Sequence, residues 1–186
     1  MGKNKFQFGI IVLLIIAAAL SRLIPHPANF APIGAMALFG AAYITNRVLS
    51  ILVPIIAMWL SDMVLTNVVY SQYYDGFQWY GNLWVYAAFL GIAVIGFVLL
   101  KKVNLTSFLG ASVLAAIAFF LITNFGTWMS TPLYPKTGVG LIAAYTAGLP
   151  FFLNTLLGNL VFGGLMFGVY NGLFSKQDLA SAFSRQ

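Results

Sequence analysis

The chain has 186 residues, of which 61% are hydrophobic and only 6% charged, and its mean hydropathy is +0.95. Because a water-soluble domain carries roughly 25% charged residues, this composition excludes a soluble globular protein. The net charge of +6 comes from Lys and Arg residues scattered along the chain without a basic stripe, so we expect no nucleic-acid partner.

The whole chain, residues 1–186, is predicted to be one integral membrane domain. A membrane-spanning helix needs about 20 apolar residues, and six such segments with short connections account for nearly the entire length. We therefore predict an all-α fold, a polytopic membrane bundle of about six transmembrane helices. The expected spans are residues 6–24, 31–46, 48–68, 80–100, 105–125 and 147–173.

A proline-rich segment follows the first span and runs from Arg22 to Gly34. Three of the seven prolines lie between residues 25 and 32, where they forbid a continuous helix and favour an extended backbone. Because such backbone at membrane depth must be buried in protein or line a polar cavity, we expect it to pack against the outer half of the bundle. A rigid connector would explain the prolines. It would not explain the polar side chains beside them: Arg22, His26 and Asn29.

The second span is only about 16 residues long, so we expect it to be tilted, broken or only partly spanning. It is rich in small residues, which also recur in the fifth and sixth spans. These residues are Gly34, Ala37, Gly40, Ala41, Ala111, Ala115, Gly163, Gly164 and Gly168. Small residues allow helices to approach closely within a membrane. The sequence leaves open whether some of them form a docking face for another membrane subunit.

The third span carries an acidic residue, Asp62, and a proline, Pro54, which is expected to kink it. A helical rise of about 1.5 Å per residue places Asp62 about 21 Å from the inner end of its span and Arg22 about 24 Å from the start of the first. Both residues therefore lie at similar depth in the outer third, and we predict an ion pair or a shared polar network. The alternative is a buried pair that only fixes helix packing. Trp59 shares a helical face with Asp62.

The outer side of the bundle is predicted to carry two long aromatic loops, residues 69–79 and 126–146. They are either an interfacial aromatic belt or a lid over a pocket. Asn124 ends the fifth span on this side, and Asn154 lies with Asn159 in the outer half of the sixth. Pro150 predicts a kink there, or a separate interfacial segment over residues 140–149.

The distribution of Lys and Arg residues along the chain predicts how the protein is oriented in the membrane. With a cytoplasmic N-terminus, seven Lys and Arg residues fall inside and two outside, a bias that holds only for an even number of spans. The inside set is Lys3, Lys5, Arg47, Lys101, Lys102, Lys176 and Arg185, and the outside set is Arg22 and Lys136. We expect a multi-pass protein of the cell inner (cytoplasmic) membrane with both termini cytoplasmic.

Enzyme signatures are missing from the sequence. It has no HExxH, no GxSxG, no paired intramembrane aspartates and no phosphate-binding glycine loop. The absence of cysteine removes thiolate chemistry, and a single histidine is poor evidence for a metal site. We expect neither an enzyme nor a cofactor or metal.

The run from Arg22 to Tyr43, RLIPHPANFAPIGAMALFGAAY, together with WLSDMVL around Asp62, resembles a family of small bacterial six-span membrane proteins of unknown function. The resemblance covers essentially the whole chain, with Ala41 at a position where the family pattern implies glycine. The family is in turn similar, more distantly, to the substrate-binding S components of energy-coupling factor transporters. That similarity implies six helices and a vitamin-sized pocket open to the outside. Residues 17–21 only vaguely resemble the Ala-rich coupling motif of S components.

The predicted function is therefore binding and uptake of a small molecule, such as a vitamin or another micronutrient, through an outward pocket. Arg22 would bind an acidic ligand group or hold Asp62, and Asp62 would orient its neighbours or receive a ligand amine. The candidate ligand-binding residues are Arg22, His26, Asn29, Asp62, Trp59, Asn124 and Asn154. The alternative is a non-transporting assembly or structural subunit that docks through Gly/Ala helix faces. Expected partners are the lipid bilayer and the small ligand. The sequence leaves open whether a membrane partner subunit, such as an energy-coupling module, joins them.

Overall fold

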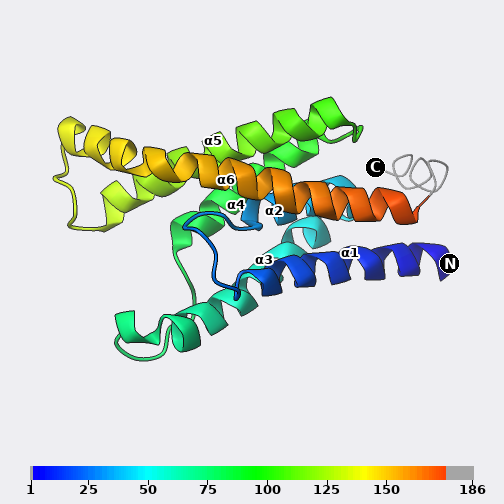
Figure 1. Cartoon of the computed structure of the whole chain (residues 1–186), viewed down its shortest axis with the longest axis horizontal. Coiled ribbons are helices and arrows are strands. Elements are labelled where there is room, and N and C mark those ends of the chain that lie inside the picture. Colours follow the sequence, from blue (N-terminus) through cyan, green and yellow to red (C-terminus); the bar gives the residue numbers. More distant parts are fainter. Residues whose placement is uncertain (1, 175–186) are drawn as a thin grey trace.

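The computed structural model describes residues 2–174, with side chains from residue 5 onward. This part of the chain contains six α-helices and no strand, which confirms the all-α prediction (Figure 1). The helices are α1 (Gly2–Ser21), α2 (Ile33–Tyr43), α3 (Arg47–Val64), α4 (Leu83–Leu99), α5 (Leu105–Ser130) and α6 (Gly138–Leu173). A π-helical turn, η1 (Leu65–Val69), and a 3₁₀ turn, η2 (Ser71–Tyr73), follow α3.

Four of the helices begin at polar N-cap side chains. Each cap accepts hydrogen bonds from backbone N–H groups that the first turn leaves free. The caps are Asn46 for α3, Asn82 for α4, Asn104 for α5 and Thr137 for α6. Helix α2 differs, because its N-cap residue is Pro32 and no side chain caps it.

Helix α2 is the centre of the bundle. All 11 of its residues are buried, and it packs against each of the other five α-helices. In Figure 1, α1 and α3 lie together on one side of it, and the α5–α6 hairpin lies on the other with α4. A helix of this length spans roughly 16 Å, about half of a bilayer core.

Glycine allows α2 to approach its neighbours closely. A Cβ at Gly40 would come within 2.6 Å of the Ser50 carbonyl oxygen and 2.8 Å of Pro54 Cγ. Pro54 has no N–H to bond that carbonyl, so the two helices meet where α3 lacks a backbone hydrogen bond. On the other side of α2, a Cβ at Gly96 would lie 2.6 Å from the Ala41 Cβ.

Three helices are long and apolar enough to cross a membrane, judged by length and composition: residues 47–69, 105–130 and 138–173. Three shorter apolar helices accompany them: residues 5–21, 33–43 and 83–99. Large apolar side chains are exposed along the outside of the bundle, including Leu52, Val94, Leu121 and Leu165.

The structure contradicts one predicted loop and excludes one of the two alternatives predicted around Pro150. Helix α5 continues to Ser130 and α6 begins at Gly138, so the expected loop over residues 126–146 is reduced to residues 131–137. Helix α5 continues through Gly126, where Trp84 packs in the space that a side chain would fill and donates through Nε1 to Ser130 Oγ at 2.7 Å. Residues 140–149 are not a separate segment, since α6 is helical through Pro150. A long helix can lose one backbone bond at a proline and continue.

Candidate functional site: a buried ion pair beside a polar cavity

The predicted partnership of Arg22 and Asp62 is confirmed. Arg22 follows the last residue of α1, and Asp62 lies near the end of α3. Arg22 Nη2 is 2.5 Å from Asp62 Oδ1, and the side chains are 9% and 8% exposed. Arg22 Nη1 also donates to the Met58 carbonyl oxygen at 3.1 Å and to Ser61 Oγ at 2.5 Å. These bonds tie the end of α1 to one face of α3.

A third residue, Tyr86 of α4, completes the network. Its hydroxyl donates to Asp62 Oδ2 at 2.6 Å, and the backbone at Gly81 leaves room for this carboxylate because a Cβ there would lie 2.7 Å from Oδ2. Asp62 therefore joins the α1–α3 side of the bundle to α4. Sequence reasoning missed Tyr86, although its place near the outer end of its span puts it at the depth of Asp62.

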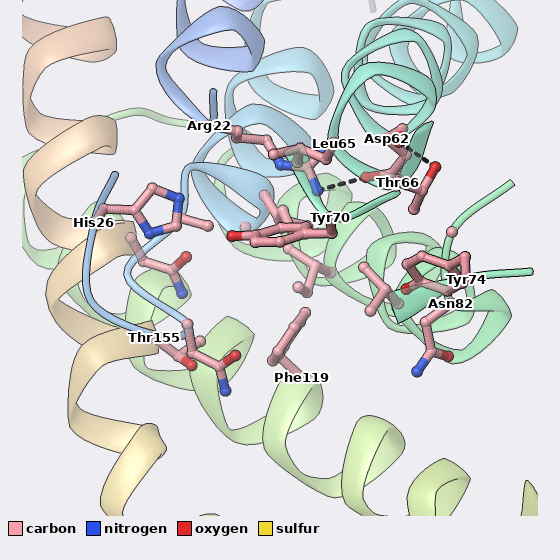
Figure 2. A pocket seen from close by; sticks show the side chains of 18 residues that line it. Arg22, His26, Asp62, Leu65, Thr66, Tyr70, Tyr74, Asn82, Phe119 and Thr155 are labelled. Carbon is pink, nitrogen blue, oxygen red and sulfur yellow. Dashed lines mark hydrogen bonds and ion pairs between the residues drawn. The ribbon is translucent and has the colours of Figure 1, made fainter. Parts of the chain in front are cut away.

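A cavity of about 270 Å³ lies beside this network. Figure 2 shows Arg22 and Asp62 joined at one wall, with His26, Thr155 and Phe119 along other parts of the lining. The polar lining comes from the connector, α3, the turn η1 and the loop after it, the N-cap residue of α4, and α6. It includes Arg22, His26, Asn29, Thr66, Asn82 and Asn159.

The π-helical turn η1 forms another part of the wall. Tyr70 N donates to the Leu65 carbonyl oxygen at 2.7 Å, the wide bonding pattern that frequently marks functional sites. Leu65 and Thr66 line the cavity from this turn, as do Tyr70 and Tyr74 from the predicted outer loop. Asn67 holds the other end of that loop through two bonds to the Gln78 backbone, at 2.8 and 2.7 Å.

The proline-rich connector is non-helical over residues 25–32, as predicted. Its turn is closed by Phe30 N donating to the Pro27 carbonyl oxygen at 3.0 Å, with Asn29 at a φ of +63°. Asparagine is among the few residues that adopt this left-handed conformation readily. Two contacts hold the connector to α6: Asn154 Nδ2 donates to the Ala28 carbonyl oxygen at 2.9 Å, and the Phe30 and Phe162 rings are 5.5 Å apart.

A second cavity, of about 330 Å³, adjoins the first. The two share a wall made of Asn29, Asn82, Val85 and Phe119. The predicted site residue Asn124 lines this second cavity, and no charged residue of the described part of the chain lines it. The charged part of the site therefore lies in the first cavity.

The predicted ligand-binding residues are thus divided by the fold. Arg22, His26, Asn29 and Asp62 line the first cavity, and Asn124 lines the second. Trp59 and Asn154 line neither. Trp59 Nε1 instead donates to the Trp79 carbonyl oxygen at 2.8 Å, and Asn154 holds the connector.

Asn159 lines the first cavity and is only 1% exposed. Its Nδ2 donates to the Ser112 carbonyl oxygen at 3.2 Å, whereas its Oδ1 has no partner among the described residues. Among the same residues, no group of three His, Cys, Asp or Glu side chains is placed to hold a metal ion.

Residues 2–181 match the model of a family described as a family of unknown function, DUF6580. No curated protein and no solved structure matches the chain. The predicted resemblance to a family of unknown function is confirmed, while the more distant similarity to S components stays a prediction. Because the match extends over nearly its whole length, the chain belongs to the DUF6580 family.

Proposed function

We propose that this protein is a six-span membrane protein with both ends in the cytoplasm, which binds and takes up a small molecule through the cavity beside Arg22 and Asp62. The observation that carries the proposal is this cavity, where a buried ion pair, amides and tyrosines converge from four parts of the chain. Intramembrane ionisable residues that line a cavity commonly mark substrate pathways.

The arrangement of helices supports a membrane location. The exposed apolar side chains of the bundle would be stable against lipid tails and unfavourable in water. Helix α2 is too short to cross alone, but it is covered by protein on all sides, and the connector extends the crossing toward the outer surface.

The described cations support the proposed orientation. The starts of α1, α3 and α5 lie at one end of the bundle in Figure 1, and this end carries Lys5, Arg47, Lys101 and Lys102. Lys136 lies between α5 and α6 at the opposite end. Lys176 and Arg185, which belong to the predicted inner set, lie outside the described residues, as does the side chain of Lys3. Positive residues at the first end favour a cytoplasmic location for it, which directs the cavity outward.

Cysteine labelling tests the orientation directly, because the chain has no cysteine of its own. Single variants Tyr74→Cys and Lys101→Cys should differ in whole cells. A membrane-impermeant maleimide should label the cysteine at position 74 and should reach position 101 only after the membrane is opened. The reverse pattern would refute the proposed topology.

Binding is tested with the purified protein in detergent and a water-soluble small-molecule extract of the expression host. The extract should raise the melting temperature of the protein. Thr155→Phe, which places a ring in the first cavity, should abolish the rise, and His26→Ala should weaken it without lowering the basal melting temperature. Leu157→Phe is the matched control, because Leu157 is 42% exposed on the outer surface of the same helix. Equal responses in both phenylalanine variants would contradict binding in this cavity.

A second candidate function is assembly with another membrane protein. A Cβ added at Gly164, Gly168 or Gly172 would meet nothing within 4 Å, so these three glycines form an open strip along α6 with a spacing of four residues. Gly163, by contrast, packs inside the bundle against Phe108. Such strips favour close helix contacts. If assembly is the function, Gly168→Leu should release a partner that co-purifies from native membranes, and Thr155→Phe should not.

A further inference from the structure

Two sets of N–H groups, those of Arg22 and those at the start of α2, remain free to meet a ligand in the first cavity. One buried acceptor of the lining, Asn159 Oδ1, also lacks a partner among the described residues. Asp62 is the only acidic residue among the described residues of the lining, and its two oxygens are already bonded to Arg22 and Tyr86. The predicted role of Asp62 as a receiver of a ligand amine is therefore not supported by its contacts. A cationic solute would meet a carboxylate that is already paired, and it would face a guanidinium.

Arg22 keeps donors available after its protein contacts are made. A guanidinium has five N–H groups. Nη1 uses two of them on α3, and Nη2 uses one on Asp62. The Nε–H and the second Nη2–H have no partner among the described residues. Because Arg22 lines the cavity, these two donors are available to an acceptor that enters it.

The start of α2 adds a second, independent set of donors. The first N–H that is bonded in this helix belongs to Met36, which donates to the Pro32 carbonyl oxygen at 2.8 Å. The N–H groups of Ile33, Gly34 and Ala35 have no acceptor in the described part of the chain, and all three residues are buried. Ile33 and Gly34 line the cavity. An uncapped helix N-terminus carries a partial positive charge.

The C-terminal end of α1 does not cancel the partial positive charge at the start of α2. Its last carbonyl groups, those of residues 19, 20 and 21, accept hydrogen bonds from the N–H groups of Arg22, Leu23 and Ile24. These acceptors are satisfied within the chain, whereas the donors of α2 are not. His26, whose ring lies at the cavity wall in Figure 2, adds a further polar group to the lining.

We infer that the first cavity selects an anionic group, such as a carboxylate or phosphate, which would be bound by the free N–H groups of Arg22 and by the start of α2. This inference rests on the proposed function and names the chemical class of its substrate. The anionic group can belong to a water-soluble molecule or to a lipid headgroup. The Arg22–Asp62 pair is neutral as a whole, so the bound anion adds the charge that the helix terminus favours.

Charge fractionation tests the inference for a ligand that is still unidentified. The water-soluble extract is separated on an anion-exchange resin into a retained and an unretained fraction. Each fraction is added to the purified protein, and phosphatidylglycerol and phosphatidylcholine are compared in separate samples. The retained fraction should raise the melting temperature by at least about 2 °C. The rise should vanish in Thr155→Phe and persist in Leu157→Phe.

The outcomes separate the inference from the proposed function. A response to the retained fraction supports both. A response to the unretained fraction alone overturns the anion inference and leaves small-molecule binding intact. A response to phosphatidylglycerol alone supports an anion site that holds a lipid and overturns the uptake of a soluble molecule. No response to any of the samples overturns both.

Discussion

The buried pair of Arg22 and Asp62 gives the sharpest test of the structure. Asp62→Asn removes one charge and leaves the Arg22 guanidinium nine-tenths buried without its counter-ion. Breaking one side of a buried pair costs about 3–5 kcal/mol, because the remaining charge keeps its desolvation penalty. Arg22→Gln should have a similar cost from the opposite side. The double variant, in which neither charge remains, should recover part of this loss.

The assay is reversible unfolding of the purified protein in mixed detergent micelles, with folded yield after membrane extraction as a second measure. We expect the double variant to lose less stability than the sum of the two single variants by at least about 2 kcal/mol. Asp75→Asn is the control, because Asp75 is exposed in the loop between α3 and α4 and should change stability by less than about 0.5 kcal/mol. Additive losses in the double variant would refute the pairing.

Three further variants test the parts that surround the pair. Tyr86→Phe removes the hydroxyl from Asp62 Oδ2 and should lower the unfolding free energy by about 1.5–3 kcal/mol, measured in the same micelles; an unchanged value would show that α4 is not tied to Asp62. At position 29, Asn29→Gly should preserve the left-handed turn, while Asn29→Ala should cost about 1 kcal/mol more; equal stabilities would contradict the turn geometry. Gly40→Val should prevent α2 from packing at Pro54 and reduce folded yield in detergent several-fold, whereas Gly164→Val, in open space, should not; equal yields would argue against the close contact.

Much of this fold could be predicted from the sequence, because the apolar segments and the helical rise fix how far along each helix a residue lies. Counting at about 1.5 Å per residue put Arg22 and Asp62 at one depth, and few other charges were available to pair with them. The three prolines between residues 25 and 32 excluded a helix in the connector for a purely local reason. The family membership, too, is contained in the sequence.

Tertiary structure alone decided which side chains meet at that depth. Asn154 and Trp59 lie near the level of the ion pair, yet they hold the connector and a loop, while Tyr86 of α4 reaches the Asp62 carboxylate. The reason is that α4 and α6 are apolar on most sides, so their sequences lack the periodic pattern that would reveal which face turns inward. Depth along a helix is a property of one segment, whereas rotation about its axis is set by the packing of its neighbours.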